Sequence, residues 1–260
     1  MPFAERGGLR FFQFESFSPA SITHAVLTRR GGVSDGPFAK LNVGLSVGDD
    51  PARVSQNIDR IFTVMDRPRT SLFDSFLVHG NGALVAGGPR PPEWGKPPQG
   101  DIILTNKPNV TLFMRYADCV PLIYVDPVKR ALALAHAGWR GTLLRVAARA
   151  VDELRIHYGS RPEDIQVGIG PAISVRNYEI GAEVVAEVQA GFTDASKLLP
   201  RFGEGLHFDL IAANRRVLEE AGVRNIEIAG LCTFDDQQDW FSHRGSGGKT
   251  GRFGVLLALR

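Results

Sequence analysis

The sequence lacks the features that mark secreted, membrane-spanning and polyanion-binding proteins. Only two cysteines occur, so a fold stapled by disulfides is not expected. Thirty basic residues are balanced by 28 acidic ones, which leaves a formal charge of +2 and gives no support for nucleic-acid binding. No run approaches the roughly 20 apolar residues of a membrane span, and the first residues hold no signal-peptide stretch. We therefore expect a cytoplasmic protein with reduced thiols and no membrane partner.

The chain is long enough to bury a core without metal or disulfide staples, because it has 260 residues of which 43% are hydrophobic. Apolar runs predict strands at residues 22–28, 110–114, 120–125, 131–135, 165–169, 226–229 and 255–259. Helical spacing predicts helices from Asp50-Pro51 to about residue 65 and over 142–157, 181–190 and 209–221. The Pro- and Gly-rich stretch 87–100 predicts a surface loop near a site. Because strands and helices do not alternate strictly, we expect one mixed α/β domain over 1–260, with mixed sheets covered by helices.

Three short segments each place a reactive side chain at the expected end of an apolar strand, namely His79, Cys119 and His136. Two imidazoles and a thiolate suit zinc, and three protein ligands leave a fourth position for water or substrate. The same trio could instead be a thiol nucleophile with a histidine base, or a small buried cysteine with two hydrogen-bonded histidines. The spacings of 40 and 17 residues match no local metal signature, so the residues alone leave these interpretations open.

The segments around Cys119 and His136 carry a family resemblance. Residues 117–121 (Ala-Asp-Cys-Val-Pro) and 136–142 (His-Ala-Gly-Trp-Arg-Gly-Thr) closely resemble the YfiH family, whose members have been called polyphenol oxidase (laccase-like), purine nucleoside phosphorylase and peptidoglycan editing factor. The likeness covers nearly the whole chain, with further matching segments in order at residues 28–34, 41–44, 48–51, 170–173, 178–181, 232–233, 241–244 and 250–252. The resemblance implies a YfiH-like layered sandwich in which His79, Cys119 and His136 bind a metal, usually taken as zinc, and form the catalytic centre.

Residues beside these motifs are candidates for contact with substrate. Arg140 and a helix expected to start at Thr142 would bind an anion, or Thr142 is a simple cap and Arg140 a surface ion-pair partner. Asp118 would orient a ligating histidine or act as an acid or base, or it forms a turn.

Candidates from the two ends of the chain complete this set. His243 and Arg244 would bind phosphate or ribose, or they lie in a solvated loop. Asn42 would bind substrate, or it is a turn-forming residue. The sequence departs from the family pattern at Leu77, where Gln is frequent, and at Gly245, where a second Arg is common. These departures concern substrate details and leave the metal trio untouched.

The resemblance favours a zinc-dependent purine nucleoside phosphorylase, which converts adenosine, inosine or methylthioadenosine and phosphate to free base and ribose 1-phosphate. Adenosine deamination would be a further activity of the same centre. Copper-dependent polyphenol oxidation is an alternative, since histidine and thiolate also suit copper, although the chain has only six histidines. A cysteine hydrolase that edits peptidoglycan precursors and a non-catalytic metal-binding protein also stay open. The expected partners are a nucleoside and phosphate; the oligomeric state is open.

Overall fold

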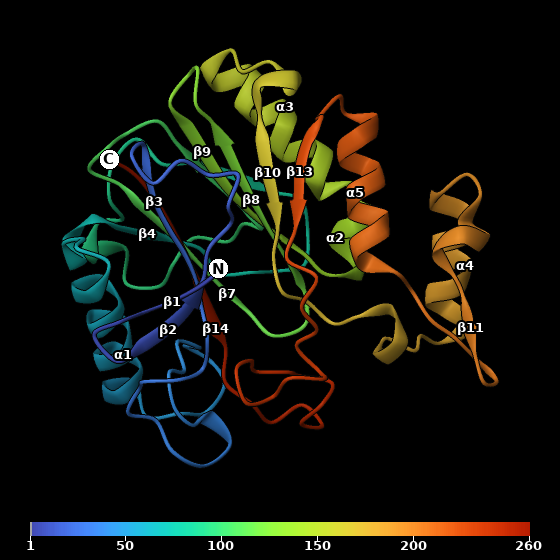
Figure 1. Cartoon of the computed structure of the whole chain (residues 1–260), viewed down its shortest axis with the longest axis horizontal. Coiled ribbons are helices and arrows are strands. Elements are labelled where there is room, and N and C mark those ends of the chain that lie inside the picture. The colour runs from blue at the N-terminus through green and yellow to red at the C-terminus, as the bar shows by residue number, and fades with distance from the viewer. Residues whose placement is uncertain (1) are drawn as a thin grey trace.

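Two six-stranded β-sheets form the centre of the computed structural model, which describes residues 2–260 (Figure 1). The first sheet has the order β1-β2-β3-β14-β7-β4, with bounds Phe3–Arg6, Leu9–Phe12, Ile22–Leu27, Phe253–Leu259, Thr111–Tyr116 and Leu72–Asp74. The second has the order β13-β10-β8-β9-β6-β5, with bounds Asn225–Ile228, Gln166–Ile169, Val120–Asp126, Ala131–Ala137, Ile102–Thr105 and Ala83–Val85. A small ribbon pairs β11 (Arg201–Phe202) with β12 (Gly205–Leu206). Parallel pairs occur at β4–β7, β5–β6 and β10–β13, and the other pairs are antiparallel, so both large sheets are mixed as predicted.

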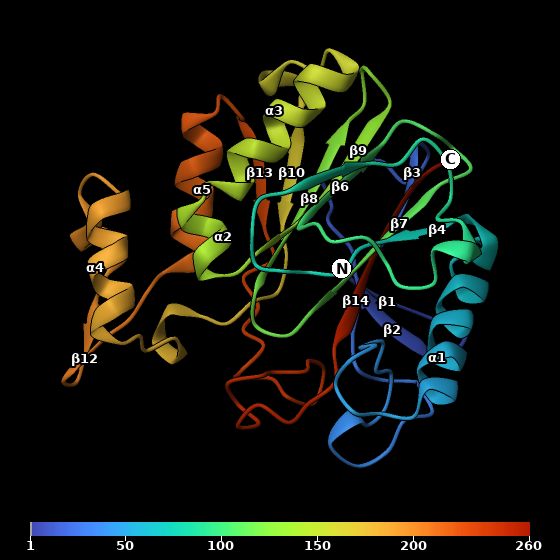
Figure 2. The same cartoon turned by 180° about the vertical axis from the view of Figure 1, so that it is seen from behind.

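Helices cover the outer faces of both sheets. Their bounds are Pro51–Val64 (α1), Trp139–Leu143 (α2), Val146–Tyr158 (α3), Ala182–Gly191 (α4) and Leu210–Glu220 (α5). Figures 1 and 2 show α1 on the side of the first sheet, α3 and α5 on the side of the second, and α4 with the small ribbon at the edge of the molecule. Within residues 2–260, no helix combines the length and apolar character that a bilayer crossing requires.

The alternation of side chains along β8 explains why the middle of the sequence is so apolar. Val120, Leu122 and Tyr124 pack in the core beneath the helices, whereas Ile123 and Val125 pack in the core between the two sheets. Successive strand residues point to opposite faces, and here both faces are covered. The strands therefore read as continuous apolar runs, and the predicted strands are confirmed apart from shifts at their ends.

The start of α1 follows the predicted cap chemistry. The Asp50 carboxylate accepts a hydrogen bond from the Ala52 N–H at 2.8 Å, and Pro51 occupies the first turn. The helix buries Val54 and Ile58 against the outer face of the first sheet, in a core that also contains Phe113 of β7. The prediction of this helix is confirmed.

The predicted helix over 142–157 is wrong at its beginning. The structure has α2 from Trp139, and then a break at Arg145, whose φ of +56° is left-handed. Thr142 therefore does not cap a helix; it is buried within α2, and its hydroxyl accepts a hydrogen bond from Asn214 Nδ2 at 2.8 Å. A helix start available to an anion at Thr142 is excluded by this arrangement.

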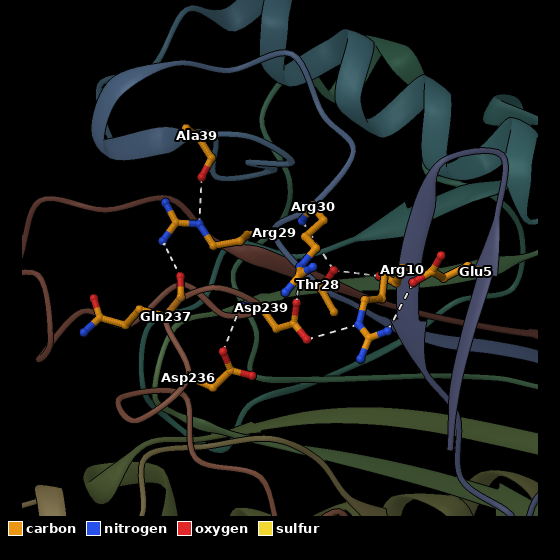
Figure 3. Close-up of polar contacts among 9 residues, drawn as sticks. All are labelled: Glu5, Arg10, Thr28, Arg29, Arg30, Ala39, Asp236, Gln237 and Asp239. Atoms are coloured by element: carbon orange, nitrogen blue, oxygen red, sulfur yellow. Dashed lines mark hydrogen bonds and ion pairs between the residues drawn. The ribbon is translucent and has the colours of Figure 1, made fainter. Parts of the chain in front are cut away.

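Hydrogen bonds join the segment before β14 to the first sheet (Figure 3). Asp239 accepts a hydrogen bond from Arg10 Nε at 3.1 Å and forms an ion pair with Arg30. Arg29 donates to the Gln237 carbonyl at 3.0 Å and to the Ala39 carbonyl at 2.7 Å. These contacts fix a long loop, residues 229–252, whose later residues reach the functional site described below.

The buried histidine of β3 is expected to make stability depend on pH. His24 is 3% exposed, its Nε2 accepts a hydrogen bond from the Phe14 N–H at 2.9 Å, and burial lowers its pKa from 6.5 to about 4 against an opposing effect of the Glu227 carboxylate. Between these two values the unfolded chain binds more protons than the folded one, so stability that is complete above pH 6.5 is lost as the pH falls toward 4. We expect this one group to lower the free energy of unfolding by about 2 kcal/mol between pH 7.5 and pH 5.

Urea unfolding of the wild type and of His24→Gln at the two pH values measures this contribution. The variant should show the smaller loss of stability on acidification, because glutamine does not titrate in this range. His157→Gln, at the exposed end of α3, is the matched control and should keep the wild-type difference. Equal pH dependence in wild type and His24→Gln would refute the prediction.

Candidate metal centre and active site

The fold brings His79, Cys119 and His136 together at one end of the two sheets. One ligand atom from each lies within 4.8 Å of the others, and the two imidazole rings are 4.9 Å apart. Within residues 2–260 this is the one group of three or more His, Cys, Asp or Glu side chains close enough to share a metal ion. The sequence expectation that these distant residues meet is confirmed, while metal binding itself stays a prediction.

The three side chains come from different elements. Cys119 lies in the short turn from β7 to β8, and His136 is the second-last residue of β9. His136 shares the face of Leu132 and Leu134, so its ring points between the sheets. His79 lies in the loop that follows β4, and the expectation of a strand end there is wrong. His79 is exposed to solvent, Cys119 is half-buried and His136 is buried.

Asp101 organises the two histidines, and sequence reasoning missed it. It is fully buried at the head of β6, where its carboxylate accepts hydrogen bonds from the N–H groups of residues 78, 79 and 80 at 2.8–3.1 Å. These bonds offset the cost of the left-handed backbone at His79, whose φ is +61°. The same carboxylate is hydrogen-bonded to His136 Nδ1 at 2.9 Å. The only sequence signal was a carboxylate directly before a buried apolar strand.

The charges around Cys119 and His136 shift the pKa values of both side chains toward their ionised forms. Burial raises the pKa of the Cys119 thiol, but the charges and hydrogen bonds of His136 and His79 outweigh burial and lower it. Burial lowers the pKa of His136, but the Cys119 thiolate and the Asp101 carboxylate outweigh it and raise it. Both shifts favour a Cys119 thiolate beside a His136 imidazolium when no metal is bound. Metal binding needs the thiolate and a neutral imidazole, so it releases a proton.

The donor set fits a borderline-soft metal ion. A thiolate and two imidazoles are ligands that zinc accepts, and a three-ligand site leaves a position for water or substrate. With Asp101 ionised, His136 Nδ1 carries the proton that it donates, so Nε2 is the nitrogen left for a metal. A carboxylate behind a ligating histidine is the usual way in which proteins fix the ring and its tautomer.

Gly138 leaves room for this cluster, which gives a test of its geometry. A Cβ at this position would lie 3.0 Å from Cys119 Sγ and 3.1 Å from His79 Cδ2, although the backbone (φ −76°) accepts any residue. We expect Gly138→Ala to displace both side chains and to weaken metal affinity by about 10-fold or more, as do changes in the residues behind metal ligands. Competition with a chromogenic zinc chelator measures this affinity.

The control for this prediction is Gly87→Ala. A Cβ at Gly87 meets nothing within 4 Å, and its backbone is not left-handed. Wild-type zinc affinity is expected in this control. Wild-type zinc affinity in Gly138→Ala as well would show that metal binding by the three side chains does not require a residue without a Cβ at position 138.

The trio forms part of the wall of a cavity of about 320 Å³ that opens to solvent. The wall combines the loop before α1, the loop after β4, the end of β7 and the segment before β14. Its residues are Gly44, Leu45, Ser46, Val47, Ser75, Phe76, Leu77, His79, Arg115, Ala117, Cys119, His136, His243 and Arg252. The predicted loop 87–100 supports this wall, because the Phe76 N–H donates to the Pro98 carbonyl at 2.8 Å.

The other predicted substrate residues differ in whether they line the cavity. His243 lines the cavity, whereas Arg140 is exposed over the Trp139 ring, 4.4 Å from its centre. Arg244 donates to the Glu179 carbonyl at 2.9 Å and lies outside the cavity wall. Of these three residues only His243 lines the cavity, and substrate contact by Arg140 and Arg244 stays a prediction.

Asn42 and Asp118 hold the cavity wall in place from behind. Asn42 Oδ1 accepts from the N–H groups of Gly44 and Arg252, each at 2.8 Å. The buried Asp118 carboxylate accepts from the Thr233 hydroxyl and from the N–H of residue 244, each at 2.6 Å. Both side chains are occupied by these bonds, so the structure gives them a positioning role. Any direct contact with substrate stays a prediction.

Comparison with known proteins finds a family match over most of the chain and relatives of similar length. Residues 23–260 match the family described as multi-copper polyphenol oxidoreductase laccase. The chain is 36% identical to a purine nucleoside phosphorylase of Deinococcus radiodurans (92% of this chain, 90% of the relative) and 34% identical to the purine nucleoside phosphorylase YlmD of Bacillus subtilis (90% and 87%).

Solved structures show the same fold. The crystal structures of the YfiH protein of Bacillus licheniformis and of YlmD from Geobacillus stearothermophilus both superpose with a TM-score of 0.90. Their sequence identities to this chain are 30% and 32%, and each comparison covers 100% of this chain and 99% of the other. The resemblance drawn from the segments around Cys119 and His136 is thereby confirmed: the chain belongs to the YfiH family of laccase-domain proteins.

Proposed function

We propose that the protein is a metal-dependent purine nucleoside phosphorylase with zinc as its metal. The observation that carries this proposal is the meeting of His79, Cys119 and His136 in the wall of one open cavity. The names of the bacterial relatives support the choice of reaction, since they are called purine nucleoside phosphorylases.

In this proposal His79, Cys119 and His136 hold the metal. When bound, the ion supplies Lewis-acid stabilisation to an oxygen of the substrate or of water. Asp101 keeps the His136 ring oriented through Nδ1.

Phosphorolysis makes two further demands on the chain. An oxygen of phosphate forms a bond to C1′ of the ribose while the bond from C1′ to the purine nitrogen breaks, and that nitrogen keeps the electron pair and gains a proton. Arg115 and Arg252 line the cavity and attract an anion. His243 on the same wall is an imidazole able to exchange a proton with the departing base. The products are the free base and ribose 1-phosphate.

The assay uses purified protein with adenosine, inosine or methylthioadenosine and inorganic phosphate. Chromatography should show release of free base that depends on phosphate and stops after chelation of the metal. Ammonia released from adenosine, measured in parallel, tests deamination by the same centre. No release of base or ammonia at micromolar enzyme would contradict the proposal.

Copper-dependent oxidation of phenols is the second candidate, and the family description favours it. Thiolate and imidazole do suit copper. However, a multicopper centre needs more ligands than the one three-residue group found within residues 2–260. Stoichiometric copper in the purified protein, with oxygen uptake on addition of a phenol, would reverse this ranking.

A further inference from the structure

Two buried polar groups in the cavity wall have no hydrogen-bond partner. They are Ser75 Oγ, in the residue after β4, and Arg115 Nη1, at the end of β7. The two residues are only 3% and 8% exposed, and both line the cavity that contains the metal trio. A buried donor without a partner costs about 1–3 kcal/mol, so such atoms call for a ligand or a functional reason.

The remaining nitrogens of Arg115 are held firmly. Its Nε donates to the Val43 carbonyl at 2.8 Å, and its Nη2 donates to Asp74 Oδ2 at 2.7 Å. These two bonds fix the guanidinium plane and leave Nη1 as the free donor. An arginine held in this way is prepared to bind an oxyanion without further ordering.

The local charge is positive. The single carboxylate of Asp74 is shared by two guanidiniums, those of Arg115 and of Arg90, whose Nε lies 2.6 Å from Asp74 Oδ1. One positive charge is therefore left over. Arg252 lines the same cavity and adds a second, near the negative charges of Cys119 and Asp118, and no Asp or Glu belongs to the wall.

Ser75 and Arg115 lie close along the chain to two residues of the metal trio. Ser75 precedes His79 by four residues and Arg115 precedes Cys119 by four residues. Four residues of extended chain span at most roughly 14 Å. Both groups of residues line the same cavity, so a nucleoside and a phosphate bound together there can contact both.

We propose that Ser75 and Arg115 form an oxyanion subsite that binds inorganic phosphate, with Arg252 as a further cation on the same wall. The Ser75 hydroxyl and Arg115 Nη1 each donate a hydrogen bond to a phosphate oxygen. The role of this phosphate as the attacking group rests on the proposed phosphorolysis, whereas its binding does not. The same chemistry would suit the 5′-phosphate of a nucleotide, and the experiment separates the two sources.

Isothermal titration calorimetry with inorganic phosphate tests the subsite directly on the purified full-length protein. We expect Arg115→Lys to raise the phosphate Kd about 10-fold and Ser75→Ala about 5-fold, since each removes a hydrogen bond to a charged ligand. The KM for phosphate should rise in the same proportion, and the KM for nucleoside should stay unchanged. Ser75→Ala removes one unpaired atom and no protein contact, so it keeps the test valid if Arg115→Lys fails to fold.

Two variants in the segment that connects α1 to β4 are the matched controls, since both side chains bond to Thr111 at the start of β7. Ser71 is equally buried but bonds to Thr111 Oγ1 and to the Pro68 carbonyl. Arg67 donates to Thr111 Oγ1, to the Pro108 carbonyl and to the carbonyl of residue 259. Ser71→Ala and Arg67→Lys should lower thermal stability without changing the Kd for phosphate.

The outcomes separate the subsite from the proposed function. Phosphate binding that is weakened in both subsite variants supports the subsite even if the wild type cleaves no nucleoside. If the wild type releases base and both variants keep the wild-type Kd and KM for phosphate, the proposed subsite is wrong. The proposed phosphorolysis would not be affected by that result. Binding of adenosine 5′-monophosphate that depends on Ser75 and Arg115, with no binding of inorganic phosphate, would overturn the assignment to inorganic phosphate.

Discussion

Cys119→Ala is expected to lose both bound metal and nucleoside cleavage. The change removes the one thiolate of the three-ligand group, and two histidines alone hold zinc far less tightly. Changes of residues behind metal ligands already cost about 10–100-fold in affinity, so loss of a ligand should cost at least about 100-fold. Elemental analysis of the purified variant and chromatography of released base measure the two effects.

The control for this variant is Cys232→Ala. Cys232 Sγ accepts hydrogen bonds from the Ser174 N–H at 3.3 Å and from Asn177 Nδ2 at 3.4 Å, and it does not line the cavity. Its replacement should leave metal content and base release near the wild-type values. Full metal content and turnover in Cys119→Ala would refute the assignment of Cys119 as a ligand. Turnover that persists in metal-free wild type but not in Cys119→Ala would instead favour thiol chemistry.

Asp101→Asn is expected to have the next largest effect. The carboxylate accepts hydrogen bonds from three successive N–H groups, at residues 78–80, and from His136 Nδ1. An asparagine has one oxygen and one NH₂ group, so at least one of these donors would face another donor. We expect the His79 loop and the His136 ring to lose their fixed orientation, with a fall of about 10–100-fold in zinc affinity. Chelator competition measures it, and base release should fall with metal occupancy at limiting zinc.

Asp126→Asn is the matched control for Asp101→Asn. Asp126 is equally buried, as the last residue of β8, and its Oδ1 accepts hydrogen bonds from the N–H groups of Val128 and Lys129 at 2.8 and 2.9 Å. This variant should lose some thermal stability while it keeps wild-type zinc affinity. If both variants lost stability alike and both kept zinc, Asp101 would be a structural residue without influence on the metal centre.

Periodicity and cap chemistry predicted much of the fold. The central strands appear as apolar runs because both of their faces are buried, and α1 begins where Asp50 and Pro51 predicted. The N-terminal hairpin of β1 and β2 and the short strand β4 were not predicted, because three or four residues carry too little periodicity. The start of α2 at Trp139 was missed because no side-chain cap marks it, as its N-cap residue is Gly138.

The candidate site was predicted less completely than the fold. Motifs led to the metal trio, since a thiol and two imidazoles are conspicuous beside apolar strands. Asp101, Ser75 and Arg115 were missed because their importance comes from contacts across the fold, such as Asp101 with a histidine 35 residues away. Asn42 and Asp118 were chosen as substrate residues, but their side chains are used in holding the cavity wall. Sequence patterns reveal reactive groups more readily than the groups that position them.

Anomalous scattering from crystals soaked with nucleoside and phosphate shows whether a metal ion lies between His79, Cys119 and His136. Data collected on both sides of the zinc and copper absorption edges identify the metal and place it. We expect one zinc peak at about 2.3 Å from Cys119 Sγ and about 2.0–2.1 Å from a nitrogen of His79 and of His136. A protein that releases free base while its crystals show no metal peak between these three side chains would refute the proposed metal centre.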